Sequence, residues 1–283
     1  MPKTDWGWLI APDELESWVI ENSPDVLAIN KPAHVICHPT KNGPWSSLSS
    51  AVREHFHLDP IHLISRLDRE TSGVILIGKS RESAARLRVQ GRRVAPANLD
   101  ELIQKTYVAT LHGTMLSPIV VNQPLARPEE GNGIFRNRQV VSPTGQRAET
   151  HFEPISHGNG YTFAKVSPKT GRMHQIRVHA AWLGHPIVGD KLYPDENLQL
   201  EFLETGWTPA LAARLPIDRQ ALHAAELTIL GQTWFAPLPE DLRTFALSIN
   251  LPPPETSLIP PPSSPPQTSY TRPDPQMHFY PRP

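Results

Sequence analysis

Short apolar runs alternate with amphipathic stretches along most of this chain, and each has the length of a single strand or helix. Continuous apolar runs predict buried strands at residues 26–29 and 73–78. Mixed or alternating apolar segments predict three more strands, at residues 106–111, 161–166 and 222–230. Because every run is far shorter than the roughly 20 residues of a membrane-spanning helix, we expect no membrane segment.

Helices are predicted at three places: residues 46–56, 80–90 and 174–183. In the first, Leu48, Val52 and Phe56 recur on one face at helical spacing. Ser80 can cap the start of the second helix, and Gly184 ends the third. Strands and helices follow one another without a regular strand–helix repeat, which favours the α+β class over a doubly wound sheet.

The two ends of the chain differ in composition from its middle. The first residues are acidic, and we expect them to pack through Trp6, Trp8 and Trp18. Residues 252–283 hold twelve of the 32 prolines and few apolar side chains, which predicts disorder. The chain is therefore divided into an acidic leader at 1–24, a folded body at 25–250 and a proline-rich tail at 251–283.

Charge is unevenly distributed although the totals nearly cancel. There are 27 Lys and Arg against 28 Asp and Glu, so no overall positive field indicates a polyanionic partner. Basic residues nevertheless outnumber acidic ones by eight to three within residues 62–93 and by five to one within residues 165–191, whereas acidic residues gather in the leader and at residues 195–204. These basic stretches fit either solvated helix faces or a surface that binds phosphate.

Cysteine and histidine usage limits the chemistry. Cys37 is the single cysteine, which excludes an intramolecular disulfide and a multi-cysteine zinc site. Without a signal-peptide pattern at its start, the chain is expected in a reducing, cytoplasmic setting. His174 and His179 are five residues apart and lack the i,i+4 spacing of a helical zinc pair, so no metal site is expected.

The segment from His62 to Lys79 concentrates reactive groups just before a buried strand. Asp68 stands between Arg66 and Arg69, and two neighbouring cations favour the ionised carboxylate that a nucleophile requires. From these residues alone, a structural carboxylate that caps the following turn is the alternative.

This segment resembles the catalytic motif of the RluA-type RNA pseudouridine synthases, in which His-Arg-Leu-Asp precedes Thr-Ser-Gly and an aliphatic strand. Four other segments are similar to motifs of this family and follow in its order: Ile29 to Ala33 with His38-Pro39, Gln104 to Ala109 with Gly113, Lys169 to His179 with residues 184–190, and Arg219 to Ala224. The resemblance spans residues 25–245. One position departs from it, because Ser65 stands where this branch has histidine before the arginine.

The resemblance implies a pseudouridine synthase fold, with a mixed, largely antiparallel central sheet flanked by helices and loops and a central RNA-binding cleft. It implies that Asp68 is the catalytic nucleophile, that Tyr107 stacks on the base and moves a proton, and that Arg177 pairs with the aspartate. Arg66 would fill the gap left by a flipped nucleotide. Further RNA contacts are expected from Arg69, Lys31, His38, Arg172, His174, Gln175 and His179. For Lys31, His38 and Asp190 a role in the protein framework is equally open, and His174 and His179 are expected either to form hydrogen bonds within the protein or to face the RNA.

The implied activity is isomerisation of specific uridines in structured rRNA or tRNA by a monomer, without a cofactor. Two other functions remain open. A base-releasing glycosylase acting through Asp68 would need a second carboxylate, and Glu70 stands too near in sequence to supply it. A non-catalytic RNA-binding or chaperone protein has no need of Asp68, Tyr107 and Arg177 together. Analysis of the product separates these possibilities.

Overall fold

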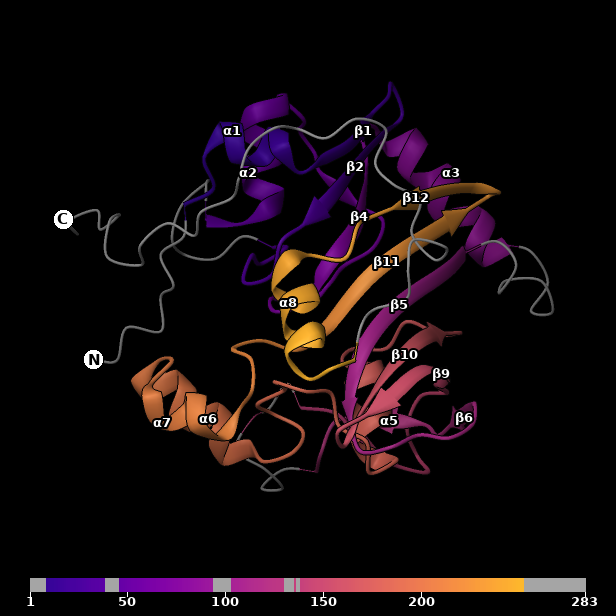
Figure 1. The fold of residues 1–283 in the computed structure, drawn as a ribbon. Coiled ribbons are helices and arrows are strands. Elements are labelled where there is room, and N and C mark those ends of the chain that lie inside the picture. The colour runs from indigo at the N-terminus through magenta and orange to yellow at the C-terminus, as the bar shows by residue number, and fades with distance from the viewer. Residues whose placement is uncertain (1–8, 39–45, 94–102, 130–134, 136–137, 252–283) are drawn as a thin grey trace.

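The computed structural model describes residues 9–38, 46–93, 103–129, 135 and 138–251. One large sheet runs through this part of the molecule from end to end (Figure 1). Its strands are β1 (Val19–Asn22), β2 (Val26–Lys31), β3 (His62–Leu63), β4 (Ser72–Gly78), β5 (Ile103–His112), β6 (Ile119–Asn122), β9 (Glu149–Gly158), β10 (Tyr161–Pro168), β11 (Leu222–Ile229) and β12 (Gln232–Phe235).

The strands of this sheet pair in the order β1-β2-β4-β11-β5-β10-β9-β6, with β3 on β4 and β12 on β11. The pairing of β4 with β11 is parallel, and the other described pairings of the sheet are antiparallel. A small separate sheet joins β7 (Leu125–Ala126) to β8 (Val140–Val141). The predicted α+β class and the mixed, largely antiparallel sheet are confirmed.

The parallel junction explains the glycine of the Thr-Ser-Gly sequence. Gly73 on β4 lies opposite Ala224 on β11, and a Cβ at this position would stand 2.1 Å from the Ala224 carbonyl oxygen. Its φ of +115° is also a conformation that side chains rarely permit. Glycine is therefore required for close approach of two strands, and this contact fixes where the chain enters β4 after Asp68.

Helices cover both faces of the sheet. They are α1 (Pro12–Ser17), α2 (Leu48–Phe56), α3 (Arg81–Arg93), α5 (Gln175–Trp182), α6 (Glu196–Thr205), α7 (Pro209–Arg214) and α8 (Glu240–Ser248). The three predicted helices correspond to α2, α3 and α5. Serine side chains cap the first two, because Ser47 Oγ accepts from Ser50 N at 3.3 Å and Ser80 Oγ accepts from Ser83 N at 3.0 Å.

The apolar runs of β2 and β4 are continuous because both faces of these strands are buried. Leu27 and Ile75 point to a core shared with α1 and α2, whereas Ala28 and Leu76 point to a core on the other face, to which α3 contributes. A third core forms where β5, β9 and β10 pack against α5 and α8 (Figure 1).

Part of the acidic leader belongs to the main sheet. Val19–Asn22 forms β1, which pairs with β2, and Trp18 is buried against α2 and its neighbours. Trp6, Trp8 and residues 252–283 of the proline-rich tail lie outside the described residues. None of the helices in the described ranges combines the length and apolar character that a membrane crossing requires.

Candidate active site

The Asp68 loop, which consists of residues 64–71 between β3 and β4, is held in place by buried side chains. Lys31 Nζ donates to the Arg69 carbonyl at 3.2 Å and to the carbonyls of Pro32 and Val35 at 2.8 and 2.9 Å. Cys37 Sγ lies 3.2 Å from the Leu67 carbonyl. These contacts hold the backbone on both sides of Asp68, whose side chain remains 30% exposed.

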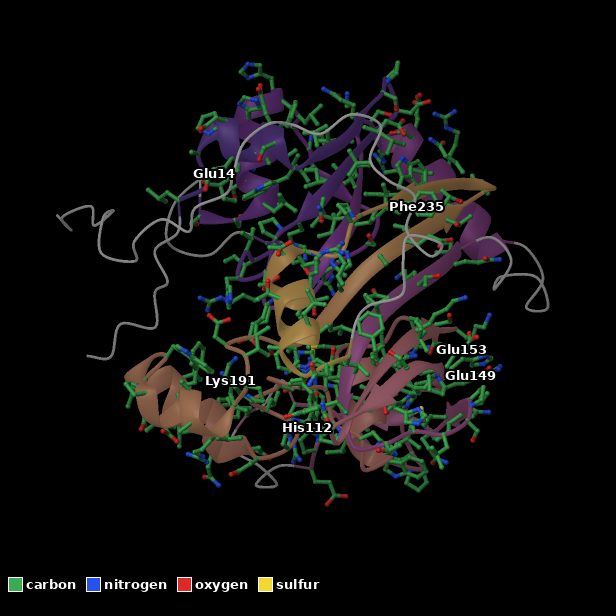
Figure 2. The ribbon with its side chains drawn as sticks, viewed as in Figure 1. Glu14, His112, Glu149, Glu153, Lys191 and Phe235 are labelled. Carbon is green, nitrogen blue, oxygen red and sulfur yellow. The ribbon has the colours of Figure 1, made fainter. Side chains whose placement is uncertain are left out.

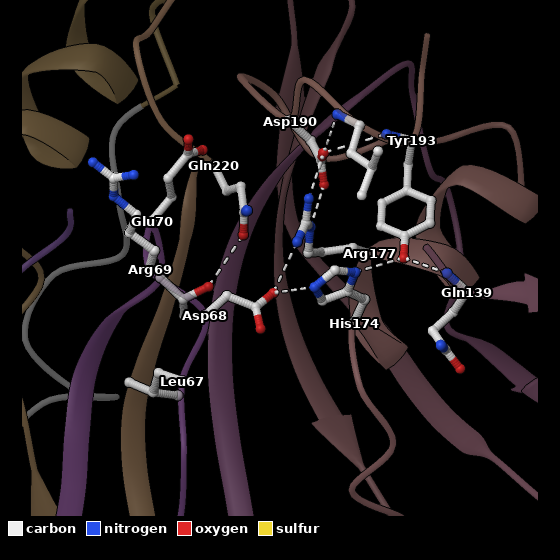
Figure 3. A network of polar contacts seen from close by, with 12 residues as sticks. Leu67, Asp68, Arg69, Glu70, Gln139, His174, Arg177, Asp190, Tyr193 and Gln220 are labelled. Atoms are coloured by element: carbon white, nitrogen blue, oxygen red, sulfur yellow. Dashed lines mark hydrogen bonds and ion pairs between the residues drawn. The ribbon is translucent and has the colours of Figure 1, made fainter. Parts of the chain in front are cut away.

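Asp68 meets Arg177 although the two residues are 109 positions apart (Figure 3). Arg177 lies on α5, and its Nη1 donates to Oδ2 of Asp68 at 2.9 Å. The predicted pairing of this arginine with the aspartate is thus present in the geometry. Oδ1 of Asp68 has no hydrogen bond or ion pair within the part of the chain that the structure describes.

Asp190 holds the opposite side of the same guanidinium. Arg177 Nε and Nη2 donate to its two carboxylate oxygens at 2.6 and 2.9 Å, and the Asp190 side chain is 1% exposed. Burial alone would lower the pKa of Arg177, but the carboxylates of Asp190 and Asp68 outweigh it and raise the pKa. Arg177 therefore stays charged and bridges two carboxylates.

Two further backbone features place Asp190. Its Oδ1 accepts from the N–H of Leu192 at 2.9 Å. Gly189 precedes it with a φ of +75°, and a Cβ there would lie 2.0 Å from the Arg219 carbonyl oxygen. The Gly-Asp pair is therefore a structural unit that positions Arg177.

His174 and Tyr193 complete the network on the far side of Asp68. His174 Nε2 lies 3.8 Å from Oδ2 of Asp68, and its Nδ1 lies 2.7 Å from the Tyr193 hydroxyl (Figure 3). The Tyr193 oxygen accepts from the backbone N–H of Gln139 at 3.1 Å. The Arg177 guanidinium also stands 5.0 Å from the centre of the Tyr193 ring.

Tyr107 lies on β5, paired with Ala224 of β11 and Val166 of β10. It lines a small hollow of about 10 Å³, the size of a single water molecule, together with side chains of the Asp68 loop and of β11, among them Ser65 and Leu67. Burial and, after it, the Asp68 carboxylate raise the pKa of Tyr107 above its usual value near 10. At neutral pH the residue is a phenol close to the carboxylate.

Glu70 and Lys191 form a second buried pair beside the site. Lys191 Nζ lies 2.9 Å from Oε1 and 3.0 Å from Oε2 of Glu70, and it donates to the Asp218 carbonyl at 2.9 Å. It also stands 4.6 Å from the centre of the Phe202 ring on α6. Figure 2 shows Lys191 where the α6–α7 segment meets the rest of the fold. The pair connects that segment to the Asp68 loop.

Arg66 is exposed at the edge of the site. Its Nη1 lies 2.9 Å from His38 Nε2, and burial followed by the charge of Arg66 lowers the pKa of His38. The two residues line a solvent-open pocket of about 490 Å³, to which Ser49 and Arg53 of α2 also contribute. The predicted RNA contacts Arg66 and His38 are thus accessible to a large ligand.

Three of the predicted RNA contacts are instead buried and fully engaged within the protein. Lys31 is 0% exposed and donates to the three carbonyls described above. Gln175 is buried, accepts from Arg172 N and donates to Glu149 O at 2.8 Å. His179 lies within hydrogen-bonding distance of Thr150 Oγ1 and the Gln123 carbonyl. Lys31 and His179 therefore fit the framework and hydrogen-bonding alternatives, and the interpretation of Gln175 as an RNA contact is corrected, because these side chains are buried and hold the loops around the site.

The remaining two predicted contacts lie farther out. Arg172 is exposed, and its Nε donates to the Arg147 carbonyl at 3.0 Å. Arg69 is partly exposed and follows Asp68 directly. Within the described ranges, no three His, Cys, Asp or Glu side chains are grouped so that they could hold a metal ion.

The predictions from the sequence leave Asp190 as a framework residue or an RNA contact and do not include Tyr193, Lys191 or Gln220. Gln220 is buried beside Arg177, and with its amide oxygen turned to the guanidinium it accepts from Nη1 at 3.2 Å. A signal was present for two of them. Asp190 and Lys191 interrupt the apolar sequence Pro-Ile-Val-Gly-Asp-Lys-Leu-Tyr, and charges inside such a run are expected to be paired when buried.

A family model and individual relatives both place this chain among the RNA pseudouridine synthases. A family model described as RNA pseudouridylate synthase matches residues 25–182. The chain is 33% identical over 228 residues to "Uncharacterized RNA pseudouridine synthase YjbO" of Bacillus subtilis, covering 77% of this chain and 71% of that protein. It is 30% identical over 239 residues to "Ribosomal large subunit pseudouridine synthase D" of Salmonella typhimurium, covering 79% and 68%.

A solved structure agrees on the fold. "Human RNA Pseudouridylate Synthase Domain Containing 4" matches with a TM-score of 0.62 and 22% sequence identity, covering 84% of this chain and 95% of that one. At this identity the likeness concerns the architecture of the chain, and it confirms the predicted pseudouridine synthase fold.

Proposed function

Because this chain belongs to the RNA pseudouridylate synthase family and resembles its RluA-type members, we propose that its RNA isomerase activity depends on Asp68 as the nucleophile. The observation that carries the proposal is the ion pair between Asp68 Oδ2 and Arg177 Nη1 at 2.9 Å, which leaves Oδ1 without a contact among the described residues. An Arg–carboxylate pair fixes one oxygen and leaves the other oriented for attack.

The reaction requires one bond to break and one to form at ribose C1′. In a covalent route, Asp68 Oδ1 attacks C1′, and uracil leaves with the electron pair of the C1′–N1 bond. The uracil turns, its C5 attacks C1′, and the carboxylate is released. The proton lost from C5 is matched by the proton gained at N1, so no redox partner is consumed. A glycal route has the same overall balance.

Tyr107 is proposed to stack on the detached uracil and to move the last proton. Since burial and Asp68 raise its pKa, the residue enters the reaction as a phenol and not as a ready base. It can take the C5 proton only as it passes its own proton on. The neighbouring Asp68 carboxylate and uracil N1 are groups to which that proton can go.

A uridine in a paired stem is out of reach of a carboxylate, so base flipping is part of the proposal. Flipping costs a few kcal/mol, which stacking and an inserted side chain offset. Arg66 is exposed, lies two residues from Asp68 and has a planar cation that can occupy the vacated stack. His38 contacts its guanidinium and can hold it near the flipped position.

The proposed substrate is a uridine in structured RNA, with ribosomal RNA ahead of transfer RNA. This order is supported by the relatives named as ribosomal large subunit pseudouridine synthases at about 30% identity. We further propose that residues 25–250, with β1 and Trp18 packed onto them, form the catalytic domain and act as a monomer in the cytoplasm.

The proposal is tested by release of tritium from RNA labelled at C5 of uridine. Wild-type protein is expected to release tritium from rRNA or tRNA, and Asp68→Asn to abolish release while retaining the wild-type circular dichroism spectrum. Undiminished release by D68N would overturn the nucleophile assignment. Free uracil as the product would indicate a glycosylase, and RNA binding without release from any RNA pool would indicate a binding protein or chaperone.

A further inference from the structure

His174 occupies an unusual position beside the Asp68 carboxylate. It lies where the preceding turn becomes α5, with a backbone φ of +55°, in the left-handed region that few L residues adopt. Its side chain is 11% exposed. A strained backbone and a nearly buried imidazole next to a reactive carboxylate are features that cluster at functional sites.

The Tyr193 hydroxyl determines which nitrogen of His174 carries the proton. Its oxygen accepts from the backbone N–H of Gln139, and the tyrosine is 9% exposed, so the hydroxyl proton needs an acceptor inside the protein. Among the described residues, Nδ1 of His174 lies 2.7 Å from the hydroxyl oxygen and can accept this proton. With Nδ1 as the acceptor, the proton of a neutral imidazole resides on Nε2.

The charge state agrees with this assignment. Burial, followed by the charge of Arg177, lowers the pKa of His174 below its usual value, although Asp68 and Asp190 act in the opposite direction. The ring is therefore neutral at pH 7, with one N–H. That N–H is on the nitrogen that faces Asp68 (Figure 3).

We propose that His174 is a positioning residue whose Nε2–H donates to Oδ2 of Asp68 when substrate closes the site. The present separation of 3.8 Å is too long for a hydrogen bond, and contacts of this kind commonly shorten in the substrate complex. Arg177 already donates to the same oxygen, so two donors would restrain Oδ2 and present Oδ1 to the ribose. The inference rests on the proposed nucleophilic role of Asp68, and it replaces the interpretation of His174 as an RNA contact.

The tautomer can be measured without any activity assay. Long-range ¹⁵N–¹H correlation spectra of the full chain labelled at histidine are expected to show His174 as the Nε2–H tautomer, assigned by the signal missing from His174→Asn. Tyr193→Phe removes the hydroxyl proton and is expected to raise the Nδ1–H population. The matched control Tyr161→Phe, which deletes a hydroxyl on β10, should leave the tautomer unchanged. An Nδ1–H tautomer in the wild type would overturn the proposal.

Single-turnover kinetics tests the role. Asparagine tolerates the left-handed backbone and can still reach Tyr193, but it does not extend to Asp68, whereas glutamine carries an amide N–H farther out. We expect H174N to slow tritium release about tenfold with little change in KM, and H174Q to recover part of the rate. A raised KM with an unchanged rate would show an RNA contact instead. Failure of the nucleophile assignment would appear separately, as activity of D68N with the wild-type His174 tautomer intact.

Discussion

Arg177 and Asp190 form a buried, two-pronged ion pair, in which Nε and Nη2 of the arginine donate to the two carboxylate oxygens at 2.6 and 2.9 Å. This geometry uses the planar edge of the guanidinium that best matches a carboxylate and leaves Nη1 for Asp68. The orientation of the proposed catalytic carboxylate therefore depends on a residue that does not touch it.

Removal of Asp190 is expected to harm both folding and activity. Asp190→Ala leaves a buried cation uncompensated on one side, and the free energy of unfolding should fall by about 3–5 kcal/mol. Asp190→Asn retains one acceptor and should cost less, while still slowing tritium release because Arg177 can rotate. Urea unfolding and release assays measure the two effects. Glu153→Ala removes an exposed carboxylate on β9 and should change neither, whereas a stable and fully active D190A would contradict the positioning role.

The pair of Lys191 and Glu70 is expected to couple the α6–α7 segment to the Asp68 loop. Lys191→Met leaves the largely buried Glu70 carboxylate without its cation. Both the free energy of unfolding and the rate of tritium release should therefore decrease. The double variant with Glu70→Gln removes the unpaired charge and should regain part of the lost stability. A double-mutant cycle in urea unfolding gives the coupling energy, and additive single effects would show that the two residues act independently.

The sequence predicts those strands and helices whose hydrophobic pattern directly reflects which residues are buried. They correspond to β2, β4, β5, β10, β11, α2, α3 and α5. β4 is buried on both faces and appears as an unbroken apolar run. β9 was not predicted, because Pro154 interrupts it and polar residues alternate irregularly along its partly exposed face. The pairing of neighbouring strands, rather than their own sequence, determines such a segment.

The sequence predicts those residues of the candidate site that belong to a recognisable motif. Asp68 and Arg177 are polar residues in motifs, and the structure brings them together across 109 positions. The roles of Lys31 and Gln175 were not predictable in the same way, because an RNA-facing and a buried polar side chain have the same sequence. Whether such a side chain is buried or faces the RNA depends on the backbone groups around it, and these come from distant segments of the chain.

His223 is expected to make the fold sensitive to acid. It is buried on β11, Nδ1 lies 2.9 Å from Ser72 Oγ and Nε2 lies 3.0 Å from the Ala236 carbonyl, and burial lowers its pKa to about 4. Between the unfolded value near 6.5 and about 4, the unfolded chain binds a proton that the folded chain does not. Stability should therefore decrease as the pH falls through this window, by at most roughly 3 kcal/mol from this residue.

The measurement for His223 is the free energy of urea unfolding between pH 4 and 8. His223→Gln is less stable at neutral pH, but its stability should fall less steeply below pH 6.5, because glutamine does not titrate. Parallel curves for the two proteins would show that other groups cause the acid sensitivity.

Arg66 is expected to matter most where the target uridine is paired. If its side chain fills the vacated stack, Arg66→Ala removes the group that offsets a flipping cost of a few kcal/mol, so release from a stem uridine should slow by about tenfold or more. Release from the same uridine in an unpaired loop should change much less, because little unstacking is required. Arg53→Ala in the same pocket is the matched control: if Arg53 contacts a phosphate, its loss should weaken binding to both RNAs alike and reduce the salt dependence by about one unit of slope. Equal losses on stem and loop RNA by R66A would assign Arg66 to the phosphate backbone and exclude its insertion into the stack.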